Sequence, residues 1–149
     1  MRVLVQRVTQ AGVRVDGEEI ASIGPGLLIF LGAAEGDSKA EADWLAEKVA
    51  NLRIFSDAAD KMNLSLLDVQ GQALVVSQFT LYGDCRRGRR PGFDKAAAPA
   101  LADELYEYFK SGLAAKGLEV ASGRFGANMA VSLVNDGPVT FIIDSPENV

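Results

Sequence analysis

The run Ser77-Gln78-Phe79-Thr80 places two hydroxyl groups directly after an apolar stretch of the chain. Polar residues at the end of a buried strand often face a functional site, and a serine or threonine there can act as a nucleophile when a neighbouring base activates it. The chain contains no histidine, so the base would be a lysine or a carboxylate, and the spacing places neither beside Ser77 or Thr80. The alternative is that both hydroxyls only satisfy nearby backbone groups, and composition alone favours that alternative.

A second polar run, Asn135 to Thr140, contains the pair Gly137-Pro138. Such a pair between two strands most often forms an ordinary turn, since only about 5–6% of X–Pro bonds in folded proteins are cis. A cis bond here would direct successive backbone carbonyl groups to one side, into a binding site. The residues alone leave both conformations open.

A cluster of positive charge interrupts a chain whose formal net charge is −5. It consists of Arg86, Arg87, Arg89 and Arg90. Guanidinium groups suit phosphate oxygens because they donate two parallel hydrogen bonds. The cluster is therefore either a solvated loop or a phosphate-binding loop, and the acidic character of the rest of the chain adds weight to the second interpretation.

Two large apolar side chains, Phe125 and Met129, flank a glycine-containing turn. Their default role is packing in the core. The alternative is an apolar shelf for a purine ring, since stacking of a base on an aromatic ring contributes about 1–3 kcal/mol.

The composition excludes several kinds of chemistry. A single cysteine, Cys85, allows no disulfide within the chain and no multi-cysteine zinc site. Without histidine there is no Ser-His-Asp or Cys-His arrangement. The N-terminal residues lack the apolar core of a signal peptide, and the longest apolar run, Leu27–Leu31, is too short to span a bilayer. We therefore expect a cytoplasmic protein with no membrane partner.

The spacing of apolar residues along the chain predicts the helices and strands that position these clusters. It indicates two long helices and about eight strands. Helical spacing predicts helices over Lys39–Leu52, where Ser38 and Glu41 form a capping box, and from Asp94 to about Lys116. Strands are predicted over Met1–Val8, Gly12–Val15, Glu18–Ile23, Leu27–Ala33, Gln72–Thr80, Leu118–Ser122, Ala127–Val134 and Val139–Asp144.

Several of these strands are joined by turns that are too short for parallel crossovers. Asp16-Gly17, for example, is a typical hairpin turn. We therefore expect an α+β fold: a single domain over residues 1–149, with a curved or partly closed, mostly antiparallel sheet and two long helices.

Taken together, the sequence resembles the D-aminoacyl-tRNA deacylases, also called D-tyrosyl-tRNA deacylases. The resemblance covers nearly the whole chain, and the motifs S-Q-F-T and N-x-G-P-x-T are both complete, at Ser77–Thr80 and Asn135–Thr140. It implies an enzyme that hydrolyses the ester between a D-amino acid and the terminal adenosine of tRNA, with no metal or organic cofactor. It also implies a homodimer with its sites at the subunit interface, where a cis Gly137-Pro138 pair enters the partner's site.

On this resemblance, each cluster has a role. The Ser77–Thr80 run is the catalytic motif, Phe125 and Met129 bind the adenosine, and the four arginines contact tRNA. A rigid Gly137-Pro138 pair rejects an L side chain by occupying the space into which it would project. Because glycine has no side chain to clash, we expect glycyl-tRNA to be hydrolysed too.

The residues alone do not decide the mechanism, and they are also compatible with two other functions. The aminoacyl ester is already activated, so positioning and an oxyanion-binding backbone N–H near Phe79 or Thr80 can suffice, with the substrate's 2′-hydroxyl in place of a protein base. Thr80 as a covalent nucleophile is the competing mechanism. The other functions are a non-catalytic tRNA-binding module, and a general small-ester hydrolase that uses Ser77 or Thr80. The expected partners are tRNA and a second copy of the chain, and not DNA.

Overall fold

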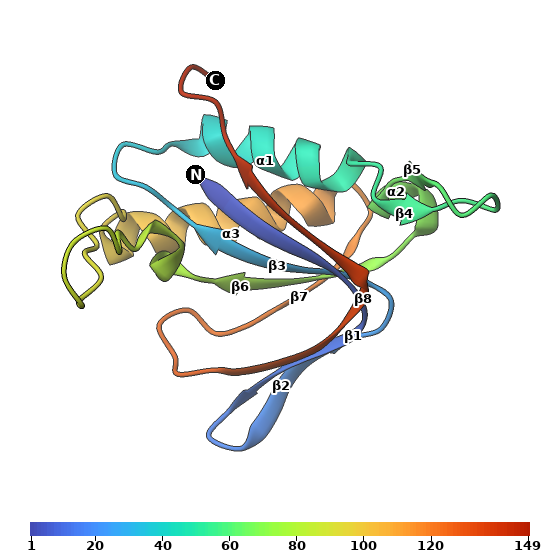
Figure 1. Ribbon diagram of the computed structural model, residues 1–149, viewed down its shortest axis with the longest axis horizontal. Coiled ribbons are helices and arrows are strands. Elements are labelled where there is room, and N and C mark those ends of the chain that lie inside the picture. Colours follow the sequence, from blue (N-terminus) through green and yellow to red (C-terminus); the bar gives the residue numbers. More distant parts are fainter.

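The computed structural model describes residues 1–149 and is built around one six-stranded mixed sheet (Figure 1). The sheet curls until it is nearly closed into a barrel, and two helices, α1 (Lys39–Asn51) and α3 (Pro99–Ala115), cover one of its faces. Its strands are β1 (Arg2–Val15), β2 (Glu18–Ile23), β3 (Gly26–Gly32), β6 (Gln72–Ser77), β7 (Glu119–Ser122) and β8 (Ala130–Asp144). The three partners of β1 run antiparallel to it, whereas β3, β6 and β7 are mutually parallel. The expected α+β fold with a curved sheet is confirmed.

The strands β1 and β8 are each continuous where the sequence predicted a break. β1 runs through residues 9–11 as one strand of 14 residues, and β8 runs through Asn135–Pro138 as one strand of 15. The two strands pair along their length, from Arg2↔Asp144 to Arg14↔Ala130, with irregularities between Gln6 and Gln10. A bulge of this kind absorbs extra residues without ending the strand, so Gly137-Pro138 lies within β8 and not in a turn.

The two long helices are present, with one boundary corrected. α1 (Lys39–Asn51) begins after Ser38, whose side chain forms the predicted capping box with Glu41. α3 (Pro99–Ala115) begins at Pro99 and not at Asp94. Proline suits the first position of a helix, and the residues before it pair with the chain beyond β3, as the Ala34↔Ala96 bridge shows.

The segment between α1 and β6 also contains structure that the sequence did not predict. A short hairpin of β4 (Phe55–Ser56) and β5 (Met62–Leu64) precedes a four-residue helix, α2 (Leu66–Val69). Ser65 and Asp68 form a second capping box there.

The core lies on both faces of the sheet. Along β3, Leu27, Ile29 and Leu31 belong to a cluster of 23 buried residues under the helices, whereas Leu28 belongs to a cluster of eight on the other face. This alternation follows from the two-residue period of a strand. None of the helices combines the length and apolar character that crossing a membrane requires.

The end of β6 determines where the first candidate cluster lies. β6 stops at Ser77 and not at Thr80, because its parallel register with β3 ends at Leu31↔Ser77. After one hydrogen bond from the Gln78 N–H to the Leu31 carbonyl (2.8 Å), the chain turns into a 3₁₀ helix, η1 (Phe79–Tyr82).

Candidate active site

A cleft of about 610 Å³ opens at the end of β6. Twelve of its 17 lining residues are hydrophobic, and none of the 17 carries an ionisable side chain. They are Leu31, Ala33, Val76, Ser77, Gln78, Phe79, Phe93, Ala96, Ala97, Pro99, Ala102, Phe125, Gly126, Ala127, Asn128, Met129 and Val131. The cleft therefore offers an apolar surface and backbone groups, but no side chain that could act as a general base.

The first cluster lies partly in this cleft. Ser77, Gln78 and Phe79 line it, whereas Thr80 is exposed and does not. The Gln78 side-chain amide donates a hydrogen bond to the Thr80 hydroxyl oxygen. An amide donor cannot take a proton from this hydroxyl, so the contact does not activate Thr80 as a nucleophile.

The start of η1 presents backbone donors beside the cleft. No side chain caps this helix, and the first N–H groups of any helix have no intrahelical acceptor. These are the amides of Phe79 and Thr80, the two expected from the sequence as oxyanion donors. The Phe79 side chain is 53% exposed, so the cleft is open to solvent at this point.

Phe125 and Met129, in the segment before β8, form another wall of the cleft. Both are half-buried, and both also pack against the core. The Phe125 ring centroid lies 6.0 Å from that of Tyr106. Met129 packs closely against Gly123, since a Cβ added to this glycine would lie only 2.6 Å from the Met129 sulfur. The packing and binding interpretations are therefore compatible, because each side chain has one side in the core and another in the cleft.

Tyr106 supports this wall and was missed in the sequence, although its spacing to Phe109 and Leu113 fits the buried side of α3. It is fully buried, and its hydroxyl is within hydrogen-bond distance of the Val75 carbonyl (3.0 Å) and the Gly123 carbonyl (3.2 Å). Burial raises the pKa of Tyr106 to about 12. The phenol stays protonated and can donate, so it ties β6 to the segment that carries Phe125.

The four arginines lie on a closed loop next to the cleft. Asp84 and Gly92 join the ends of this loop by two backbone hydrogen bonds (2.7 and 2.9 Å), and all four arginines are exposed. Phe93 follows directly, lines the cleft, and contacts the Phe79 ring edge-on at 5.1 Å between centroids. The loop therefore starts at the cleft rim.

The arginines are not equivalent. The Arg86 guanidinium binds both carboxylate oxygens of Asp84 (2.9 and 2.8 Å) and lowers the pKa of Asp84 to about 2. The other three, Arg87, Arg89 and Arg90, form no ion pair within the chain.

Gly137 and Pro138 do not line the cleft of their own chain. Their peptide bond is cis, as predicted, and both residues are exposed. From Ala130, where β8 starts, to Asn135 the extended strand covers about 17 Å, which carries the pair away from the cleft.

The Gly137-Pro138 segment is held by its neighbours. The Asn135 carboxamide accepts from the Val139 N–H (2.8 Å) and donates to the Thr140 hydroxyl (2.9 Å). Arg7, which is buried, donates to the Asp136 carbonyl (3.2 Å). The motif is therefore an ordered projection on the surface of β8.

No group of three or more His, Cys, Asp or Glu side chains is arranged so that it could hold a metal ion.

Comparisons with known proteins agree with this fold and identify the family of the chain. The family model described as D-Tyr-tRNA(Tyr) deacylase matches residues 4–144. The chain is 58% identical to a D-aminoacyl-tRNA deacylase of Geotalea uraniireducens and 59% identical to one of Thermomicrobium roseum, and both matches cover 99% of this chain and 96% of the relative.

Two solved structures share the fold. One, titled c-Myc DNA Unwinding Element Binding Protein, has a TM-score of 0.92 and 39% identity, and the match covers 98% of this chain and 99% of that one. The other, a probable eukaryotic D-amino acid tRNA deacylase, has a TM-score of 0.83 and 18% identity over 96% of this chain and 98% of that one. The second likeness bears on the fold alone.

The curled sheet, the cleft beside η1 and these relatives define an enzyme of the tRNA deacylase class. Within that class, the chain belongs to the D-Tyr-tRNA(Tyr) deacylase family, whose model covers almost all of it.

Proposed function

We propose that the cleft binds the aminoacyl end of D-aminoacyl-tRNA and that the chain hydrolyses the ester bond, releasing the D-amino acid and tRNA. The observation that carries the proposal is the composition of the cleft, which joins the Ser77–Phe79 wall to the Phe125–Met129 wall without an ionisable side chain. Such a site suits a substrate that is already activated. Membership of the deacylase family supports the same reaction.

The terminal adenine occupies the wall that Phe125 and Met129 form. Both are half-buried apolar side chains that face the cleft. A purine on this wall gains stacking and apolar contact of about 1–3 kcal/mol. The ester at the ribose then lies near the Ser77–Phe79 wall of the same cleft.

Hydrolysis proceeds by positioning and by stabilisation of the oxyanion. Water attacks the ester carbonyl carbon, negative charge develops on the carbonyl oxygen, and the free amides at the start of η1 donate to it. The ester bond then breaks, and the ribose oxygen leaves as a hydroxyl. The substrate's neighbouring 2′-hydroxyl transfers the proton, because the cleft supplies no side-chain base. Ser77 lines the cleft but has no base beside it, and Thr80 lies outside the cleft.

A second copy of the chain completes the site. β8 pairs only with β1, so its outer edge is free, and Ile142 and Phe141 on it are 63% and 39% exposed. An apolar free edge of this kind favours association with another chain. Each chain then inserts its Gly137-Pro138 pair into the cleft of its partner, because the pair does not line the cleft of its own chain.

The Gly137-Pro138 pair excludes L-aminoacyl substrates. It is a rigid backbone feature held by Asn135 and Arg7, and it blocks the direction of an L side chain while the D direction stays open. Glycyl-tRNA passes the same filter. The exposed arginines Arg87, Arg89 and Arg90 contact the tRNA backbone, and we place the activity in the cytoplasm.

The test compares three readouts on purified protein. We expect turnover of D-aminoacyl-tRNA, little or no turnover of the ethyl ester of the same D-amino acid, and weaker binding of tRNA that carries no amino acid. Binding of tRNA without turnover would instead indicate a non-catalytic tRNA-binding module. Equal turnover of the ethyl ester and the tRNA ester would indicate a general small-ester hydrolase.

A further inference from the structure

No residue of the short helix η1 is fully buried: Leu81 and Tyr82 are half-buried against the sheet, and Phe79 and Thr80 are exposed. At its start, the backbone is tied to the sheet by the hydrogen bond from Gln78 to Leu31. An element with few buried contacts opens locally at a low cost in free energy. A second attachment is therefore needed if the Phe79 and Thr80 amides are to keep a fixed position.

Arg2, the first residue of β1, provides that attachment. Its Nη1 donates to the Leu81 carbonyl oxygen (2.9 Å), and its guanidinium lies 5.0 Å from the centroid of the Tyr82 ring. Leu81 and Tyr82 are the last two residues of η1. A charged donor makes a stronger hydrogen bond than a neutral one, and a cation over an aromatic ring adds to the attraction.

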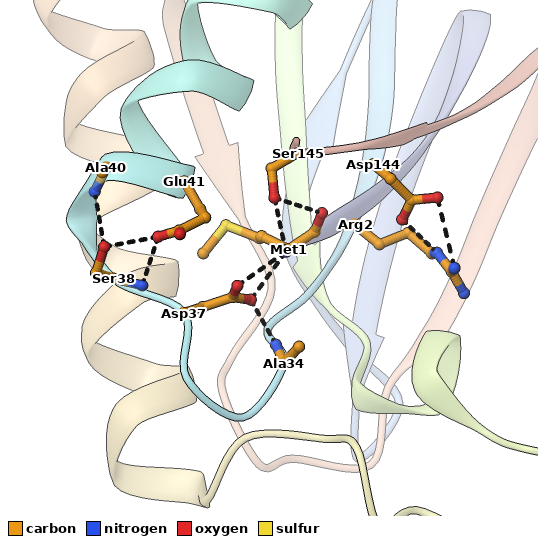
Figure 2. A network of polar contacts seen from close by, with 9 residues as sticks. All are labelled: Met1, Arg2, Ala34, Asp37, Ser38, Ala40, Glu41, Asp144 and Ser145. Atoms are coloured by element: carbon orange, nitrogen blue, oxygen red, sulfur yellow. Dashed lines mark hydrogen bonds and ion pairs between the residues drawn. The ribbon is translucent and has the colours of Figure 1, made fainter. Parts of the chain in front are cut away.

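Asp144 on β8 orients the Arg2 side chain, as Figure 2 shows. Arg2 Nε donates to one carboxylate oxygen (2.7 Å), and Nη2 lies 3.5 Å from the other. On its other side, Arg2 is paired with Gly32 of β3. A Cβ at Gly32 would lie 3.1 Å from the Gln78 carbonyl oxygen and 3.2 Å from the Leu81 Cβ, so η1 rests directly on the Gly32 backbone.

The strand ends that carry this pair are themselves fixed (Figure 2). The Met1 ammonium group donates to the Ser145 hydroxyl (2.9 Å) and forms an ion pair with Asp37 (2.9 Å). The Ser145 N–H donates in turn to the Met1 carbonyl oxygen (2.9 Å). Arg2 therefore reaches η1 from a rigid base.

We infer that Arg2 is a positioning residue for the deacylation site: by binding the Leu81 carbonyl from the sheet, it fixes η1 and therefore the Phe79 and Thr80 amides. This inference rests on the proposed function, because it assigns these amides to the oxyanion. Arg2 itself does not line the cleft, so it acts through η1 and not on the substrate.

The activity test uses Arg2→Met, which removes every donor and keeps an unbranched side chain. We expect kcat for D-tyrosyl-tRNA to fall at least about tenfold, with KM within about twofold of wild type. Arg2→Lys keeps a cation that can reach Leu81 and should recover part of kcat. The matched control is Arg14→Met, at the far end of β1, where the exposed Arg14 pairs only with Glu19 and Gly17; both constants should stay unchanged.

Amide hydrogen exchange tests the positioning directly and independently of activity. The amides of Leu81 and Gly83, which bond to Gln78 and Thr80, should exchange about tenfold faster in Arg2→Met, while those of β6 keep their protection. Asp144→Asn should also speed exchange at these amides and lower kcat, each by a smaller factor. This variant replaces Arg2→Met in the test if Arg2→Met does not fold.

Unchanged exchange at Leu81 and Gly83 would overturn the inference. So would a rise in KM at constant kcat, because Arg2 would then bind tRNA. A wild-type chain without deacylase activity would contradict the proposed function alone, and the exchange measurement would still decide whether Arg2 fixes η1.

Discussion

Two hydroxyl groups lie at or next to the cleft, and neither donates a hydrogen bond to a carboxylate or an amine. Ser77 lines the cleft without an ionisable neighbour there, and the Thr80 oxygen accepts a hydrogen bond from the Gln78 amide. A protonated hydroxyl is a weak nucleophile at neutral pH. This arrangement supports the proposed mechanism, in which reactivity comes from backbone donors and from the substrate.

Thr80→Ala should therefore keep substantial deacylase activity. Alanine at this position leaves the backbone N–H groups at the start of η1 in place. By contrast, tRNA that ends in 2′-deoxyadenosine should be a much poorer substrate, because it lacks the hydroxyl that transfers the proton. The measurement is the single-turnover rate of the Thr80→Ala enzyme on normal substrate, compared with that of the wild-type enzyme on the deoxy substrate. A loss of ~10³-fold for Thr80→Ala, about 4 kcal/mol of transition-state stabilisation, with normal cleavage of the deoxy substrate, would make Thr80 the nucleophile.

Phe125→Leu should raise KM for D-aminoacyl-tRNA about five- to twentyfold while kcat changes little. Leucine keeps most of the apolar volume that packs near Tyr106 but removes the ring face, which contributes about 1–3 kcal/mol to base stacking. The matched control is Phe30→Leu, since Phe30 is also half-buried but does not line the cleft. Equal KM values for the two variants would assign Phe125 to the core alone.

At the scale of elements, local patterns predicted most of the fold. The capping box at Ser38, the Asp16-Gly17 hairpin and the alternation of apolar residues are signals within a few residues of each other, and the structure contains all three. The predicted strand ends are wrong where pairing with a segment distant in the sequence determines how far a strand extends. β8 continues through Pro138 because β1 pairs with it on both sides of the irregular region, and β6 ends at Ser77 because its partner β3 ends.

The candidate site could be predicted only in part for the same reason. The Ser77–Phe79 wall and the Phe125–Met129 wall are each recognisable as sequence clusters, and the fold brings them together in one cleft. Phe93 and Tyr106 were missed, because their roles depend on contacts with Phe79 and Phe125 that no local spacing reveals. The exclusion of Thr80 from the cleft likewise depends on the turn into η1.

The arginine loop should determine how steeply tRNA binding depends on salt. Replacing Arg87, Arg89 and Arg90 together by Gln should reduce the slope of log K against log salt by up to about 1 for each phosphate that the loop no longer neutralises. Arg86→Gln should have a smaller effect, because Asp84 already neutralises this side chain. Arg14→Gln, an exposed arginine on β1, is the control. An unchanged slope in the triple variant would mean that the loop is only a solvated surface.

At the scale of the whole molecule, the proposed site needs residues from two copies of the chain. The cleft lies at the end of β6, whereas the Gly137-Pro138 projection lies within β8 and does not line it. The free apolar edge of β8 supplies a surface on which two chains can associate. A dimer would bring the projection of one chain to the cleft of the other.

Sedimentation should show a dimer at assay concentration, and Ile142→Asp should shift it to monomer. The isoleucine is 63% exposed on β8, so a carboxylate there is tolerated in the single chain but is costly when an interface removes it from water. Val69→Asp, on the exposed end of α2, is the control that keeps the dimer. A wild-type monomer with full activity would contradict the shared site.

The most direct test of the account is the ratio of single-turnover rates for D-tyrosyl-tRNA and L-tyrosyl-tRNA, measured with the same enzyme preparation and the same tRNA. A cleft that accepts the ester and a rigid projection that excludes one enantiomer predict that the D substrate is cleaved at least ~10²-fold faster, about 2.7 kcal/mol of discrimination. Equal rates for the two enantiomers, or no cleavage of either, would contradict the account.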